Sequence, residues 1–175
     1  MRPVTELTCA DGTVLSVEPV PVLDRTGVPY EVTLRLLRDG AVFGEVGERC
    51  GWFLRTALAR LEDGTSTLEQ GVRAWARADG LEPEAAWADL QRYLPRDREL
   101  LAFLARDPVD PSAAGELRVW LRPERRWAAS GWVVEHRAVL DAWGADGRGV
   151  RAVMDRTALR ALLVGLVAAV DVALA

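Results

Sequence analysis

The chain has 175 residues, of which half are hydrophobic and 27% are charged, and its formal net charge is −4. This length and balance are typical of one folded domain and argue against an extensively disordered chain. The acidic excess disfavours general binding to nucleic acid or to an anionic membrane, because both carry negative charge.

The amino-acid composition suggests the kind of source organism, and the opening residues suggest the cellular compartment. Lysine, isoleucine and asparagine do not occur, a bias that a GC-rich genome produces, so we expect a high-GC bacterial source. The opening residues, MRPVTELTCADG, hold no apolar segment of the kind found in secretory signals. We therefore expect a cytoplasmic protein in which Cys9 and Cys50 are free thiols.

The N-terminal part predicts two hairpins. Four short segments of alternating hydrophobicity come first, at residues 4–9, 13–18, 31–38 and 41–46. Asp11-Gly12 separates the first pair and Asp39-Gly40 the second, and both residue types tolerate the positive φ of a type I′ turn. Between the hairpins we predict an irregular connection, marked by Pro19, Pro21, Gly27 and Pro29.

Helical spacing replaces this alternation from Gly51 onward. The pattern predicts four short helices: one ending near Gly64, one from Ser66 toward Gly80, one from Pro83 to about Leu94, and one capped by Asp97 that carries Leu100, Leu101 and Phe103. Residues 107–112, DPVDPS, then predict an exposed loop.

The C-terminal third returns to strands. Alternation at residues 115–122 places Leu117, Val119 and Leu121 on one face. Residues 132–143 fit a helix or a strand, and we favour the strand because two adjacent valines follow turn residues. Residues 150–154 predict the last strand, with Asp155 capping a final helix, and the alternative is one helix from Val150 to the end.

The final helix is the most apolar part of the chain. Ten uncharged residues separate Arg160 from Asp171, which is too short a run to span a bilayer and is typical of a buried core helix. Because apolar residues occupy nearly all sides, the helix must be covered by the rest of the chain or by a partner. We therefore also consider a homo-oligomer contact through this helix, at Val164 and Ala168.

Together these patterns predict a single α+β domain spanning residues 1–175, in which residues 65–111 are a candidate helical insertion. We expect a mainly antiparallel sheet built from N- and C-terminal strands, packed against several central helices and the long apolar C-terminal helix. Strands that alternate in hydrophobicity indicate a sheet with one packed face and one partly solvated face.

Motifs for known chemistries are weak. Cys50 stands before a predicted helix, where a thiol pKa is lowered, and His136 is the one histidine that could act as its base. The serines occur in no G-x-S-x-G elbow, and one histidine with two distant cysteines supplies too few ligands for a transition metal. The G-x-G-x-x-A match at residues 147–152 has no following strand, so we interpret its glycines as turn residues and predict neither cofactor nor metal.

The most suggestive surface feature is a group of arginines and tryptophans near the predicted strand at 115–122. Its members are Arg118, Trp120, Arg122, Arg125, Arg126 and Trp127. These two residue types are enriched at interface hot spots, because they combine broad contact area with hydrogen bonds or cation–π attraction. The alternative is an ordinary strand surface, in which arginine stems cover the rings and the guanidiniums pair with Glu135.

These observations favour a non-enzymatic protein-binding module, such as an immunity-type or accessory factor that occludes a protein partner. The alternative is a small-ligand-binding protein or an enzyme with a tryptophan-lined pocket and a Cys50/His136 pair. We expect no membrane association and see no strong nucleic-acid signal.

Overall fold

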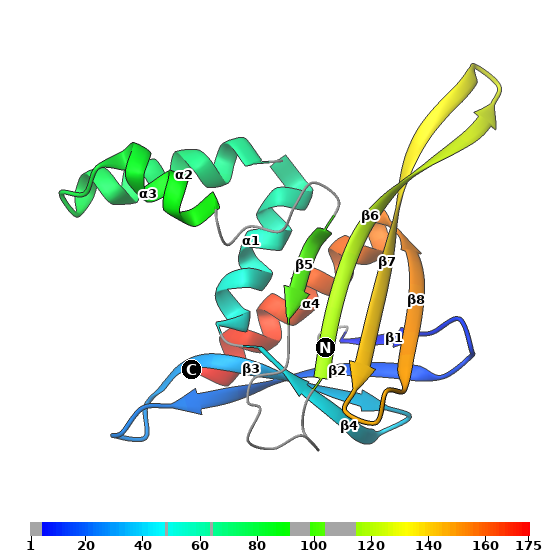
Figure 1. Ribbon diagram of the computed structural model, residues 1–175, viewed down its shortest axis with the longest axis horizontal. Helices are drawn as coiled ribbons and strands as arrows, with labels where there is room; N and C mark the ends of the chain where they lie inside the picture. The colour runs from blue at the N-terminus through cyan, green and yellow to red at the C-terminus, as the bar shows by residue number, and fades with distance from the viewer. Residues whose placement is uncertain (1–4, 48, 64, 92–98, 104–114) are drawn as a thin grey trace.

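The computed structural model describes residues 5–47, 49–63, 65–91, 99–103 and 115–175. Within these ranges the elements in chain order are β1 (Glu6–Thr8), β2 (Val14–Leu23), β3 (Pro29–Arg38), β4 (Ala41–Val46), α1 (Cys50–Asp63), α2 (Thr65–Ala78), α3 (Pro83–Gln91), β5 (Glu99–Phe103), β6 (Gly115–Ala128), β7 (Gly131–Gly144), β8 (Gly149–Asp155) and α4 (Arg156–Leu174). The α+β class is confirmed (Figure 1). Leu94, Asp97 and the predicted loop at 107–112 lie outside the described residues.

The strands form two antiparallel sheets instead of the one sheet that we predicted. β1-β2-β3-β4 make one four-stranded sheet and β5-β6-β7-β8 make the other. The strands of the second sheet run across those of the first (Figure 1). Alternation tells which face of a strand is buried but not which strand lies beside it, so the sequence pattern was compatible with either arrangement.

Most local predictions in the strands are confirmed. Asp39 and Gly40 both have positive φ, 49° and 81°, as a type I′ turn requires. Residues 132–143 lie within β7, and the final helix follows β8 as a separate element. Asp155 caps this helix, because its carboxylate accepts a hydrogen bond from the Ala158 amide at 2.7 Å.

The predicted helix after Asp97 is wrong where the structure describes it. Glu99–Phe103 form β5, an outer strand that pairs with β6 through Leu101↔Val119 and Phe103↔Leu117. A short apolar run does not distinguish a strand from a buried helix by its period alone. The helical part of the predicted insertion at 65–111 therefore consists of α2 and α3 in the described residues, and β5 belongs to the second sheet.

Prolines inside strands account for two further corrections. β2 continues through Pro19 and Pro21 to Leu23, where we predicted an irregular connection, and β6 continues through Pro123. In each case the neighbouring outer strand has already ended, since β1 pairs only with Val14–Ser16 of β2 and β5 reaches only to Trp120 of β6. A proline that lies on a free strand edge loses no ladder hydrogen bond on that side.

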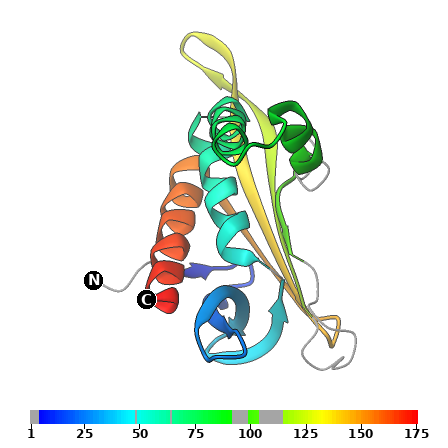
Figure 2. The ribbon, with the colours of Figure 1, turned by 90° about the vertical axis from the view of Figure 1, so that its left-hand side faces the viewer.

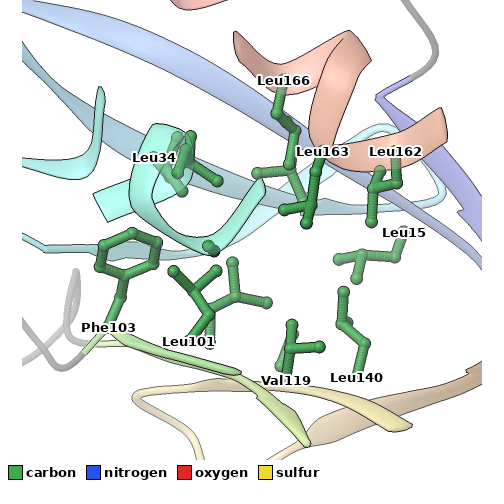
Figure 3. Packing of buried hydrophobic residues seen from close by; sticks show 14 of the residues in the cluster. Leu15, Leu34, Leu101, Phe103, Val119, Leu140, Leu162, Leu163 and Leu166 are labelled. Atoms are coloured by element: carbon green, nitrogen blue, oxygen red, sulfur yellow. The ribbon is translucent and has the colours of Figure 1, made fainter. Parts of the chain in front are cut away.

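Two antiparallel helices, α1 and α4, fill the space between the sheets (Figure 2). Leu162, Leu163 and Leu166 of α4 point into one cluster with residues of both sheets, among them Leu15, Leu34, Leu101, Val119 and Leu140 (Figure 3). The Glu31 carboxylate on β3 accepts a hydrogen bond from the Gly51 amide at 2.9 Å, which satisfies a free N–H in the first turn of α1. One core therefore joins both sheets and both helices.

Glycines permit β4 to cross the end of the β6–β7 pair at close range. Gly115 and Gly144 are register partners at this end. A Cβ at Gly144 would lie 2.4 Å from the Phe43 carbonyl oxygen, and a Cβ at Gly115 would lie 3.2 Å from the Glu45 amide nitrogen. Any larger side chain would separate the sheets, because these neighbours are backbone atoms.

The α4 helix is covered on one side only, which differs from our expectation of an enclosed helix. Its buried residues are Leu159, Leu162, Leu163, Gly165, Leu166 and Val170. Val164 and Val172 on the opposite side are 40% and 77% exposed. By length and composition α4 could cross a membrane, with a mean hydropathy of 2.0, although its buried side belongs to the core of this fold.

We expect Leu163→Ala to lower the free energy of unfolding by about 2–5 kcal/mol, because it leaves a cavity between α4 and the sheets. Leu81→Ala is a matched control, since the same change at this 48% exposed leucine removes little buried surface. Chemical denaturation of both variants measures the difference. Equal stability of the two variants would contradict the placement of Leu163 in the core.

Candidate functional site

The β6–β7 hairpin extends beyond the rest of the molecule. Arg122 pairs in register with Arg137, which in turn pairs with Asp155 at the end of β8. Past this row, β7 is the only described strand that pairs with residues 123–128 of β6, and these residues project about 20 Å at the usual rise of a strand. We call residues 123–136 the hairpin arm (Figure 1).

The predicted arginine–tryptophan group is divided between the two faces of this hairpin. The register is unbroken from Gly115↔Gly144 to Ala128↔Gly131, so side chains alternate along all of β6. Arg118, Trp120, Arg122 and Arg126 therefore share one face, and Arg125 and Trp127 share the other. Our expectation of a turn after Pro123 is wrong, and a single six-residue patch does not form.

On the outer face of the second sheet, ion pairs occupy the guanidinium of Arg118 and those of two neighbouring arginines, Arg137 and Arg151. Arg118 pairs with Glu116 on its own strand, and Arg137 pairs with Glu124 across the hairpin. Asp141, which is 4% exposed, binds Arg151 through contacts of 2.6 and 2.9 Å. These hydrogen bonds raise the pKa of Arg151 above its ordinary value. Arg118 and its neighbours thus resemble an ordinary charged strand surface, with Trp120 half-buried among them.

The arm itself is different, because its two tryptophans are exposed. Trp127 and Trp132 are register partners whose rings meet edge to face, with centroids 5.3 Å apart and planes at 80°. They are nevertheless 66% and 68% exposed. By alternation this pair lies on the same face as Leu117, Val119 and Leu121, beyond the point where the helices cover it.

Arginines accompany the tryptophan pair. Arg122, Arg125 and Arg126 are all exposed. Among the side chains that the structure describes, no ion pair joins Arg122 or Arg125 to a carboxylate. The hairpin therefore presents two exposed rings together with the guanidiniums of Arg122 and Arg125. This combination is suited to an apolar surface bordered by acidic groups.

Trp132 is the important residue that sequence reasoning missed. The predicted arginine–tryptophan group includes Trp127 but not Trp132. The signal was available, because Ala128-Ala-Ser-Gly131 is short enough to close a hairpin and would place the two tryptophans opposite each other.

The structure does not bring Cys50 and His136 together. Cys50 is fully buried at the start of α1, where its thiol lies 3.6 Å from the Val46 carbonyl oxygen. Gly47, close to Cys50 in the chain, lies beside the ring of Phe103. Phe103 pairs in register with Leu117 on β6, which in turn pairs with Ala142 on β7. His136 is six residues farther along β7, about 20 Å away along the strand. Cys9 and Cys50 form no disulfide in the described structure, and burial raises the pKa of the Cys9 thiol.

No tryptophan lines the open groove between the β3–β4 hairpin and the β7–β8 turn. This groove has a volume of about 270 Å³ and is bordered by Arg38, Ala41, Val42, Phe43, Asp146, Arg148 and Val150. Gly147, part of the G-x-G-x-x-A match, lies in the same turn with a φ of 72°. Among the described residues, no three His, Cys, Asp or Glu side chains gather as a metal site would require.

No family model, curated protein or solved structure matches this chain.

The burial of Cys50 predicts a slow thiol. In a Cys9→Ala variant, whose remaining thiol is Cys50, we expect iodoacetamide to react more than about a hundredfold more slowly in the folded protein than in urea. Mass spectrometry of quenched samples measures both rates. Rapid alkylation of the folded variant at mildly acidic pH would indicate an exposed, acidic thiol and would favour the enzyme alternative.

Proposed function

We propose that this protein is a non-enzymatic binding module that uses the hairpin arm to hold a protein partner. The observation that carries the proposal is the Trp127–Trp132 pair, which remains two-thirds exposed on an apolar face that the protein's own helices leave uncovered. Large exposed aromatic rings are unfavourable in water and are enriched at the centres of protein interfaces.

The geometry of the arm supports a partner that surrounds it. Among the described residues, 123–128 have neighbours only on β7, so a partner surface can approach both faces of the hairpin and its edges. One face offers the two rings together with Arg125, and the other offers Arg122 at the base of the arm. A partner with an apolar pocket and acidic groups at its rim would match both faces.

The finer proposal is an immunity-type or accessory factor from a high-GC bacterium that works by occlusion. An arm about 20 Å long is sufficient to enter a cleft or cover a working surface on its target, without chemistry of its own. Residues 123–136 hold two arginines and two glutamates, so the arm is formally neutral within an acidic chain, and Arg125 beside the two rings is the group suited to an acidic neighbour on the target.

We expect the double variant Trp127→Ala/Trp132→Ala to bind the partner at least about thirtyfold more weakly than the natural chain. The fold should be unaffected, because the arm lies outside the core. The partner is obtained by affinity capture from a lysate of the source organism and identified by mass spectrometry. Its affinity for each purified variant is then measured by calorimetry.

Trp75→Ala is the matched control, because Trp75 is a 54% exposed tryptophan on α2, away from the arm. This variant should bind like the natural chain. Capture of the same partner with undiminished affinity by the double variant would show that the arm does not carry the binding.

A further inference from the structure

The outward side of α4 is an apolar helix face with a defined charge pattern. Helical spacing brings Ala161, Val164, Ala168 and Val172 to this side, and all four are exposed. Val164 and Val172 are 40% and 77% exposed, so the fold leaves these apolar side chains in contact with water. The face is separate from the hairpin arm and does not enter the function proposed above.

Charged pairs with α1 mark both ends of one edge of this face. Near the start of α4, Arg160 pairs with Glu62 of α1 at 2.5 Å. Near its end, Asp171 pairs with Arg55 of α1. Asp171 comes eleven positions after Arg160, or about three helical turns and about 16 Å, so both lie on the edge that borders α1.

We propose that this face binds a second copy of the chain, with the two α4 helices antiparallel about a two-fold axis. The axis passes between Val164 and Ala168, so Val164 meets the partner's Ala168 and Ala168 meets the partner's Val164. A two-fold of this kind keeps the α1 edge of both helices on the same side. Arg160 then lies beside the partner's Asp171, and Glu62 lies beside the partner's Arg55.

The charge pattern selects this arrangement over a parallel one. In a parallel pair the two-fold axis would run along the helices and place the α1 edges on opposite sides of the interface, so Arg160 and Asp171 would have no oppositely charged partner across it. Antiparallel pairing brings these opposite charges together on one side, which favours it. Small residues between the charged ends allow the helices to approach closely, and they are apolar enough to exclude water once covered.

The first test measures mass by sedimentation velocity over micromolar to millimolar concentrations. The natural chain should reach twice the 19.2 kDa of one chain, and Val164→Glu should remain at the single-chain mass. Val153→Glu is the matched control: Val153 is a 50% exposed valine on β8, far from the α4 face, and this variant should still dimerise. A natural chain that stays at 19.2 kDa throughout, or binds lipid vesicles through α4 without dimerising, overturns the proposal.

The second test uses charge reversal to identify the arrangement. Arg160→Glu alone places two like-charged contacts in its homodimer, as does Asp171→Arg alone, and each should dimerise roughly tenfold or more weakly than the natural chain. Mixing the two variants makes both contacts attractive in the heterodimer, which should therefore form in preference to either homodimer. A loss of stability that a substitution causes within its own chain would remain after mixing, whereas a repulsive contact between chains would be relieved. Failure to recover a dimer in the mixture therefore contradicts the antiparallel pairing.

Discussion

The structure depends on the antiparallel contact between α1 and α4 in the space between two crossed sheets. At one end of this contact Gly51 approaches Val170 so closely that a Cβ would lie 2.9 Å from the valine side chain. At the other end the Arg156 guanidinium donates to the Leu61 carbonyl oxygen of α1. Glu31 fixes the first turn of α1 to the first sheet, while the leucines of α4 reach the second sheet. In the described residues the two sheets meet through these helices, at the crossing of β4 and through the hydrogen bond from the Ala10 amide to the Arg151 carbonyl oxygen, and the helix pair holds one half of the chain against the other.

The candidate interaction surfaces are the apolar regions that this core does not use. The inner face of β6 and β7 is covered by helices as far as Leu121 and Ala138, and it is bare where Trp127 and Trp132 stand. In the same way, the leucines of α4 are buried by the sheets while its outer valines are left in solvent. The first surface continues a buried sheet face past the helices that cover it, and the second is the opposite side of a helix whose leucines are buried. Exposed apolar regions of this kind are expected where a partner completes the packing.

The sequence was sufficient to predict local structure where interactions between neighbouring residues determine that structure. Positive φ at Asp39-Gly40, the cap at Asp155 and the alternation of Leu117, Val119 and Leu121 depend on a few neighbouring residues, and each prediction is confirmed. The division into two sheets, the strand at Glu99–Phe103 and the passage of strands through Pro19, Pro21 and Pro123 depend on distant neighbours. The arginine–tryptophan group is divided for a related reason: a predicted strand that ended at Arg122 placed six residues on one surface, whereas the continuous strand alternates them between two faces.

The two proposed surfaces are connected through the base of the arm. Asp155, the cap of α4, pairs in register with Arg137, so the arm begins at the level where α4 begins. Antiparallel pairing of two α4 helices would place these two starting points at opposite ends of a 19-residue helix, about 28 Å apart. A dimer would then carry two hairpin arms that point away from each other, and two identical partner sites on a repetitive or dimeric target could be held at once. Because linked binding events raise the effective concentration at the second site, even a modest affinity per arm would give firm occlusion of such a target.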